Sequence, residues 1–99
     1  MKNTSLEKML KNCDKVSQLL RSLSHPVRLK VLCQVIEGEK TVNELTKFCG
    51  ISQSAMSQFL ARMRDQKILS SRKEGIYVFY SLSDVKIKKV IYTLKEIYC

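Results

Sequence analysis

The segment from residue 52 to 65 constrains the fold most strongly, because its apolar and polar side chains separate onto two faces of a helix. The apolar face has the spacing of a core-facing stripe and carries Ala55, Met56, Phe59, Leu60 and Met63. The opposite face carries small or hydrogen-bonding side chains with cations at its edges, namely Gln53, Ser54, Ser57, Gln58, Ala61, Arg62 and Arg64. Solvated helices usually place Glu–Lys pairs there, whereas short polar side chains allow a helix to enter a DNA major groove. The pattern therefore indicates a recognition helix, with an ordinary amphipathic surface helix as the alternative.

A shorter helix is expected directly before this segment. Thr41 and Glu44 have the spacing of a capping box, which predicts that a helix begins there. Residues 49–51 supply a turn that contains glycine, and Ser52 is a good cap for the helix that follows. Two helices joined in this way are typical of a helix-turn-helix, which we predict over residues 41–66.

A β-hairpin is expected after the recognition helix. Two runs rich in β-branched and aromatic residues, 68–73 and 76–81, lie on either side of a turn at Gly75. A hairpin in this position is a wing, which we predict over residues 68–82.

The predicted wing carries both charge and apolar surface near its tip. Arg72 and Lys73 stand just before the turn, where they can lie on the phosphate backbone beside the groove. Ile76 and Tyr77 are less polar than a wing tip usually is, so we expect them to pack beneath it.

The N-terminal part predicts one helix up to residue 23, opened by a capping box from Thr4 to Glu7. Its apolar residues recur at alternating steps of three and four, at Leu6, Met9, Cys13, Val16, Leu20 and Leu23. This a/d seam fits a partner helix from a second copy, or a helix lying on its own core.

Two further helices complete the chain. One is expected from Pro26 to Gly38, with His25 in a capping or packing role at its start. Its inner stripe consists of Leu29, Leu32, Cys33 and Ile36, with Val35 beside it. The last helix is capped by Ser83 and Asp84, and its apolar stripe consists of Ile87, Val90, Ile91, Leu94 and Tyr98. The predicted fold is mainly α with a β-hairpin wing, a winged helix-turn-helix of five helices in a single domain, residues 1–99.

The charge of the chain points to a polyanionic partner. The formal net charge is +9 and the isoelectric point is near 9.6. Such an excess suits nucleic acid or an anionic membrane surface. The longest run without charge, residues 48–61, is shorter than the ~20 apolar residues that span a bilayer. The N-terminus has no apolar signal core, so we expect a soluble cytoplasmic protein.

The cysteines give little support to a preassembled metal site. Cys13, Cys33, Cys49 and Cys99 form no Cys-x-Cys or Cys-x-x-Cys motif, and His25 is the only histidine. In a cytoplasmic protein these residues are expected to be thiols. We expect no cofactor, no metal and no enzymatic activity.

Three stretches resemble the ArsR/SmtB-type winged-helix repressors. They are residues 23–29, residues 51–60, and residues 73–75 together with 80–82. The resemblance implies a homodimer built on the helices within 1–23 and 83–99, which binds operator DNA with imperfect two-fold symmetry and represses transcription.

Residues of the helix-turn-helix and wing are the candidates for contacting DNA. We expect base edges to be contacted by Gln53, Ser54, Ser57 and Gln58, and phosphates by Arg62, Arg64, Arg72 and Lys73. Many members of the family have histidine where Phe59 stands. Phe59 falls on the apolar face, so we expect it to pack.

The metal sites of the family are absent from this sequence. Glu44-Leu45 is not followed by Cys-x-Cys, and the last helix has Asp84 without a histidine. Cys33 and Cys99 instead resemble the dithiol branch, the BigR-, HlyU- and SqrR-like regulators. That resemblance implies that reactive sulfur species join the two thiols through a disulfide or a chain of sulfur atoms. It assigns no role to Cys13 or Cys49.

Several alternatives remain open from the sequence. Cys33 can be an ordinary core cysteine, and Cys99 an incidental thiol. A thiol-based metal or metalloid sensor could use Cys13, Cys33 and Cys99 as soft ligands. Lys30 and Lys95 are candidate cations for activating a thiol. A partner-binding module or a thiol enzyme would come from other classes, and the motifs of a thiol enzyme are not visible.

Overall fold

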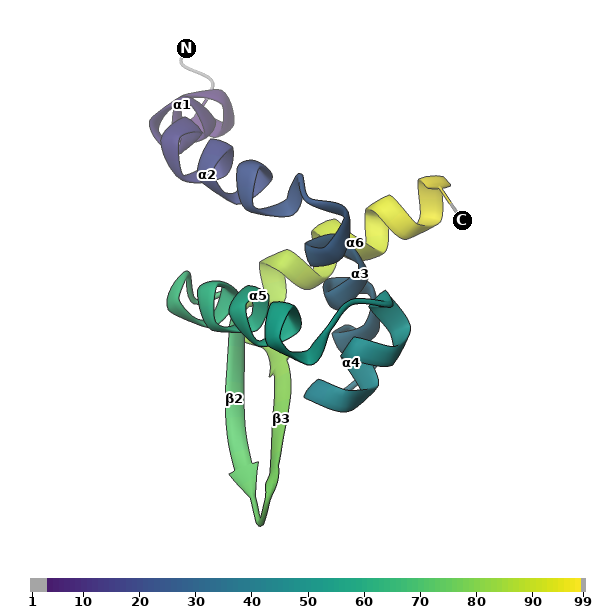
Figure 1. The fold of residues 1–99 in the computed structure, drawn as a ribbon. Coiled ribbons are helices and arrows are strands. Elements are labelled where there is room, and N and C mark those ends of the chain that lie inside the picture. The colour runs from purple at the N-terminus through teal and green to yellow at the C-terminus, as the bar shows by residue number, and fades with distance from the viewer. Residues whose placement is uncertain (1–3, 99) are drawn as a thin grey trace.

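Six helices and a three-stranded antiparallel sheet make up the computed structural model, which describes residues 4–98 (Figure 1). The helices are α1 (Thr4–Lys11), α2 (Cys13–Leu23), α3 (Pro26–Val35), α4 (Val42–Cys49), α5 (Gln53–Asp65) and α6 (Val85–Tyr98). The strands are β1 (Lys40–Thr41), β2 (Leu69–Glu74) and β3 (Tyr77–Leu82), in the order β1-β3-β2. The prediction of a mainly α winged helix-turn-helix is confirmed. No helix in the described range is long and apolar enough to cross a membrane.

The hydrophobic core lies where α3, α4 and α5 meet the base of the sheet. Met56, Leu60 and Met63 of α5 are fully buried, as are Leu32 of α3 and Leu45 of α4. The apolar face predicted for the recognition helix is therefore the face that packs into the core. Burying side chains of this size contributes about 1.5–3 kcal/mol each.

Local hydrogen bonds explain where three helices begin. Thr41 and Glu44 form the predicted capping box, in which the Glu44 N–H donates to Thr41 Oγ1 at 3.2 Å and the Thr41 N–H donates to Glu44 Oε1 at 2.9 Å. Ser52 Oγ accepts from the Ala55 N–H at 3.1 Å. His25 caps α3, since its Nδ1 accepts from the Val27 N–H at 3.1 Å. All three caps were predicted.

The turn between α4 and α5 depends on Gly50. This residue ends α4 in the left-handed conformation, with φ +68° and ψ +31°. Its N–H donates to the Thr46 carbonyl at 2.9 Å, which closes the last turn of α4. A glycine adopts this conformation without the steric penalty of a Cβ, so the chain can reverse into Ser52.

The wing is a hairpin with a two-residue loop. Glu74 pairs with Tyr77, and Gly75 takes the first loop position with φ +62°, the position where a type II′ turn needs glycine. Each strand begins one residue later than predicted. No sequence pattern predicted β1, whose two residues pair with Tyr80 and Phe79 of β3.

The first predicted helix is divided, which raises the number of helices from five to six. The break lies at Asn12, which has φ −98° and ψ 5°. The Asn12 side chain donates to the Lys8 carbonyl at 2.8 Å and so competes for a backbone acceptor of the helix. The predicted capping by Thr4 involves a side chain outside the described part.

Three expectations about side-chain packing were wrong. Cys33 is exposed, because the buried stripe of α3 runs through Val31, Leu32, Val35 and Ile36 and leaves Cys33 off to one side. Ile76 and Tyr77 do not pack beneath the wing tip, since their exposed fractions are 89% and 54%. Tyr98 is also exposed, although Ile87 and Ile91 of the same helix are buried.

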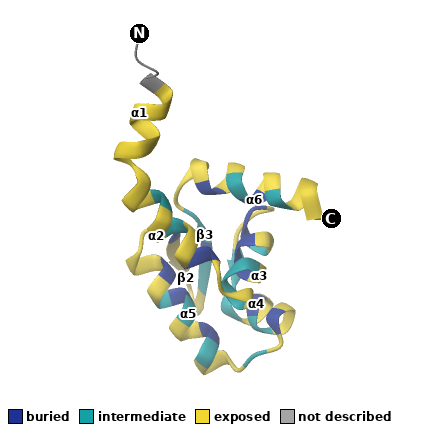
Figure 2. Cartoon of the chain, turned by 90° about the horizontal axis from the view of Figure 1, so that it is seen from above, coloured by how far each residue is buried: buried dark blue, intermediate teal, exposed yellow. Residues whose placement is uncertain are grey.

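Helices α1 and α2 project away from the body, at the end opposite the wing tip (Figure 1). Most of their surface is exposed, as Figure 2 shows. The radius of gyration is 15.2 Å, against about 13 Å for a compact domain of this length. The end of α2 is anchored, because Leu23 is buried and Ser22 Oγ lies 3.3 Å from Gln66 Oε1 at the end of α5.

Replacing Gly50 by alanine should lower the free energy of unfolding by about 1–2 kcal/mol, because a Cβ disfavours φ +68°. No atom outside the neighbouring residues lies within 4 Å of the position a Cβ would take, so conformational strain is the expected cause. Urea denaturation measures the change. Gly50→Asn should cost less, since asparagine tolerates the left-handed region, and equal losses for the two variants would contradict this explanation.

Candidate nucleic-acid interface

The polar face of α5 is open to solvent. Gln53, Ser54, Ser57 and Gln58 are all exposed, whereas the apolar face of the same helix is buried. Ser52 caps the helix one residue before its start, so the first turn presents backbone N–H groups as well as short side chains. This face can donate and accept hydrogen bonds without long side chains that would hold the helix away from a groove.

Three of the predicted phosphate-binding cations have exposed charges. Arg62 and Arg64 stand in the last turn of α5, and Lys73 stands on β2 near the wing tip. Within the described residues none of these three forms an ion pair. Their charges are therefore available to a polyanion from both the helix and the wing.

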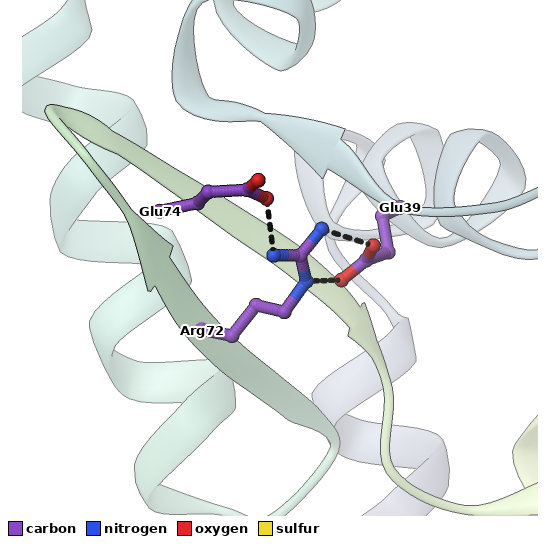
Figure 3. Close-up of polar contacts among 3 residues, drawn as sticks. All are labelled: Glu39, Arg72 and Glu74. Atoms are coloured by element: carbon purple, nitrogen blue, oxygen red, sulfur yellow. Dashed lines mark hydrogen bonds and ion pairs between the residues drawn. The ribbon is translucent and has the colours of Figure 1, made fainter.

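Arg72 has a different environment from the other predicted cations (Figure 3). Its Nε and Nη2 donate to Glu39 at 2.7 and 2.9 Å, and its Nη1 donates to Glu74 at 2.6 Å. The guanidinium also lies 4.6 Å from the centre of the Phe79 ring. Hydrogen bonding to Arg72 lowers the pKa of Glu39 below its ordinary value. The structure thus brings two carboxylates to a cation that the sequence assigned to phosphate.

A hollow separates the wing from the helix-turn-helix, with a volume of about 160 Å³. Its lining comes from the starts of α4 and α5 and from the wing, at Thr41, Val42, Asn43, Gln53, Ile76, Tyr77 and Val78. Asn43 and Ile76 were not among the predicted site residues. Only the three-dimensional fold brings them beside Gln53, so no local sequence signal marks them.

Phe59 packs as predicted. It is half-buried, and its ring centre lies 4.8 Å from that of His25 at an interplanar angle of 52°. His25 makes two contacts: its ring packs against Phe59, and its Nδ1 caps α3. The two residues join α3 to α5 behind the exposed polar face.

The cysteines have three kinds of environment. Cys33 on α3 and Cys13 at the start of α2 are exposed, whereas Cys49 is buried at the end of α4. Burial raises the pKa of the Cys49 thiol, and the charge of Lys30 partly offsets this rise. Cys99 lies outside the described residues. Among the residues described, no group of three or more His, Cys, Asp or Glu side chains is placed to hold a metal ion.

An ion pair connects the end of α6 to the segment after α3. Lys95 Nζ lies 3.2 Å from Glu37 Oε1. In sequence, Lys95 precedes position 99 by one helical turn, and Glu37 follows Cys33 by the same spacing. Lys95 is therefore paired with a carboxylate, and the charge of Lys30 acts to lower the pKa of the Cys49 thiol.

The helix-turn-helix, the hairpin and the exposed polar face of α5 together define a winged helix-turn-helix protein. A family model described as "Bacterial regulatory protein, arsR family" matches residues 25–71. The HTH-type transcriptional regulator YgaV of Escherichia coli (strain K12) is 37% identical over 97% of this chain and 98% of its own length. The chain belongs to the ArsR family of bacterial regulatory proteins.

Other relatives combine similar sequence with similar structure. The transcriptional activator HlyU of Vibrio cholerae is 39% identical over 96% of this chain and 88% of its own length. The crystal structure of the transcriptional repressor BigR from Xylella fastidiosa superposes with a TM-score of 0.88 at 39% identity, covering 94% of this chain and 95% of that one. A structure described as reduced HlyU from Vibrio cholerae has a TM-score of 0.87 at 39% identity, with coverages of 94% and 98%. These similarities confirm the resemblance drawn from the sequence.

Alkylation should distinguish the buried thiol from the exposed ones. In the fully reduced, folded protein at pH about 8, we expect iodoacetamide to modify Cys49 at least about tenfold more slowly than Cys33, because burial limits both access and thiolate formation. Peptide mass spectrometry after timed quenching measures both rates. In denaturant the two rates should converge. Equal rates in the folded protein would show that Cys49 is more accessible than its burial indicates.

Proposed function

We propose that this protein is a homodimeric transcriptional repressor whose binding to operator DNA is switched by reactive sulfur species. The observation that carries the DNA-binding part is the exposed face of α5, which is short and polar and is flanked by the cations of the helix end and the wing. Because its proposed ligand is operator DNA, we place the protein in the cytoplasm.

The proposed interface divides into base contacts and phosphate contacts. Four exposed side chains on the polar face are the candidates for base edges, namely Gln53, Ser54, Ser57 and Gln58. Glutamine and serine both have the donors and acceptors that major-groove edges require. Arg62, Arg64 and Lys73 are the candidates for phosphates, which fix position and supply the salt-dependent part of affinity.

The surface opposite the wing supports the proposal of a homodimer. Apolar side chains on α1, α2 and α6 are exposed, at Leu6, Met9, Leu10, Leu20, Val85, Tyr92, Ile97 and Tyr98. These helices lie away from the wing tip, so a second copy can cover them and leave both α5 helices open (Figure 1). A two-fold dimer of this kind would read an operator with imperfect two-fold symmetry, with half-sites ~34 Å apart.

Salt dependence tests the proposed DNA interface. Three cations per subunit give six phosphate contacts per dimer, so the slope of log K against log salt should be about −5. Arg64→Gln should make this slope shallower by about 2, because each subunit loses one phosphate contact. Fluorescence anisotropy with the DNA upstream of the gene measures the slope, and sedimentation measures whether two chains bind each site.

A matched variant controls for the change in net charge. Lys89→Gln removes the same charge from an exposed position on α6, outside the proposed interface, and should leave the slope unchanged. If Arg64→Gln and Lys89→Gln changed the slope equally, the effect would come from net charge, and the assignment of α5 as the recognition helix would lose its support.

Two observations support Cys33 and Cys99 as the proposed switch. Cys33 is exposed on α3, so a small oxidant can reach it. The ion pair between Glu37 and Lys95 brings together segments that lie one helical turn from positions 33 and 99 in sequence.

The proposed reaction transfers sulfur and then closes a bridge. One thiolate takes a sulfur atom from glutathione persulfide and releases glutathione, which leaves a protein persulfide. The second thiolate then attacks, and loss of hydrosulfide gives a disulfide. If a further persulfide first lengthens the chain by one sulfur atom, the same attack gives a trisulfide. Because a direct disulfide requires Cα atoms within ~7 Å, a longer bridge would tolerate a wider gap between the two residues.

Intact mass and DNA binding together test the switch. After treatment with glutathione persulfide, we expect one or more sulfur atoms bridging Cys33 and Cys99 and weaker operator binding. The Cys33→Ser, Cys99→Ser double variant should keep its binding under the same treatment, whereas Cys13→Ser should still respond. Release of the double variant by persulfide would refute the proposed pair. Release only by a thiophilic metal ion would point to metal sensing.

A further inference from the structure

One side chain of the wing crosses the sheet toward the helix-turn-helix. Arg72 lies on β2, beside Phe79 of β3, and reaches over the Phe79 ring to Glu39. Glu39 immediately precedes β1, whose second residue, Thr41, caps α4. The ion pair therefore joins the hairpin to the segment from which the helix-turn-helix begins (Figure 3).

Arg72 makes more hydrogen bonds to its carboxylate partners than a usual surface ion pair does. Arg72 makes two parallel hydrogen bonds to Glu39 and a third to Glu74, while the Phe79 ring covers one side of the guanidinium. Isolated surface pairs contribute little, but bidentate arginine–carboxylate pairs within a network are the exception. Lysine cannot reproduce this arrangement, because an ammonium lacks the planar fork.

The same geometry makes Arg72 a poor phosphate ligand. Three of its five N–H groups already bind carboxylates, and the three charged residues together carry a net charge of −1. A phosphate approaching Arg72 would meet two carboxylates. Lys73 is next in sequence and has no ion pair among the described residues, so it can take that role.

We propose that Arg72 is a positioning residue, which fixes the wing against the segment before α4 through Glu39 so that Lys73 meets the phosphate backbone. The two-residue pairing of β1 with β3 also joins the wing to this segment. The proposal rests on the proposed DNA-binding function and reverses the role that the sequence predicted for Arg72.

The effect of Glu39→Gln on operator affinity distinguishes the two roles. If Arg72 positions the wing, removing the Glu39 charge weakens operator binding by about fivefold. If Arg72 is a phosphate contact that Glu39 holds back, the same change tightens binding. Glu37→Gln is the matched control, because it removes the same charge two residues earlier from a glutamate that pairs with Lys95. It should change affinity by less than about twofold.

Two further readouts separate positioning from charge. Arg72→Lys keeps the charge and should weaken binding as Glu39→Gln does, with the salt slope unchanged. Combining it with Glu39→Gln should add little, because both variants break the same contact. Tighter binding by Glu39→Gln, or full affinity of Arg72→Lys, would overturn the proposal.

Hydrogen exchange of the free protein tests the contact without DNA. Glu39→Gln should speed the exchange of hairpin amides near Phe79 while leaving those of α5 unchanged, since the core of α5 does not depend on Glu39. Unchanged exchange in the hairpin would overturn the proposal even where wild-type DNA binding is intact. Absence of wild-type binding together with faster hairpin exchange would refute the DNA-binding function but retain the role of Arg72 in holding the wing.

Discussion

The burial of one side of α5 is the constraint on which the rest of the structure depends. Met56, Leu60 and Met63 are fully buried, and truncating a buried side chain of this kind costs about 2–5 kcal/mol. A single exposed hydrogen bond contributes only about 0.5–1.5 kcal/mol, so the core and not the polar face sets the rotation of the helix. Since a helix is rigid on this scale, that rotation directs Ser54, Ser57 and their polar neighbours outward.

The same core positions the base of the wing, whereas the tip lies outside the core. Lys67 takes a positive φ of 62° directly after α5, and the next two residues, Ile68 and Leu69, are buried. The Ser83 N–H donates to the Ile68 carbonyl at 3.0 Å, which fastens the return strand to the same point. Toward the tip the residues are exposed. The base of the hairpin is therefore held by the core, and its outer part is held by the pairing of β2 with β3 and by the contact of Arg72 with Glu39.

Sequence reasoning succeeded where the determining interactions are local. The caps at His25, Thr41 and Ser52 involve partners two or three residues away, so the starts of α3, α4 and α5 were predictable. The apolar period of α5 likewise fixed its buried face. The division of the first helix was missed: at Asn12, where the side chain donates to the carbonyl of Lys8, the apolar periodicity continues through the break.

The features that the sequence did not reveal depend on contacts distant along the chain. Glu39 and Arg72 are 33 residues apart, and nothing near either residue marks the pairing. Strand β1 exists only because β3 lies beside it. Cys33 belonged to an apolar stripe by spacing, yet the stripe that α3 buries is rotated toward Val31 and Val35. In a helix with apolar residues on several sides, packing decides which side is covered, and spacing alone does not.

The position of α3 indicates how a bond at Cys33 would reach the DNA-binding face. Its inner side, with Val31 and Leu32, is fully buried in the core, while Cys33 lies on the outer side. Because packed interiors resist small deformations, a bond at the outer side would move the neighbouring helix more readily than the core. Helix α2, one of the helices proposed to form the dimer, contacts the end of α5 through Ser22 and Gln66. If the proposed dimer and switch exist, a bond at Cys33 would reorient whole subunits and change the distance between the two α5 helices, while each helix-turn-helix keeps its structure.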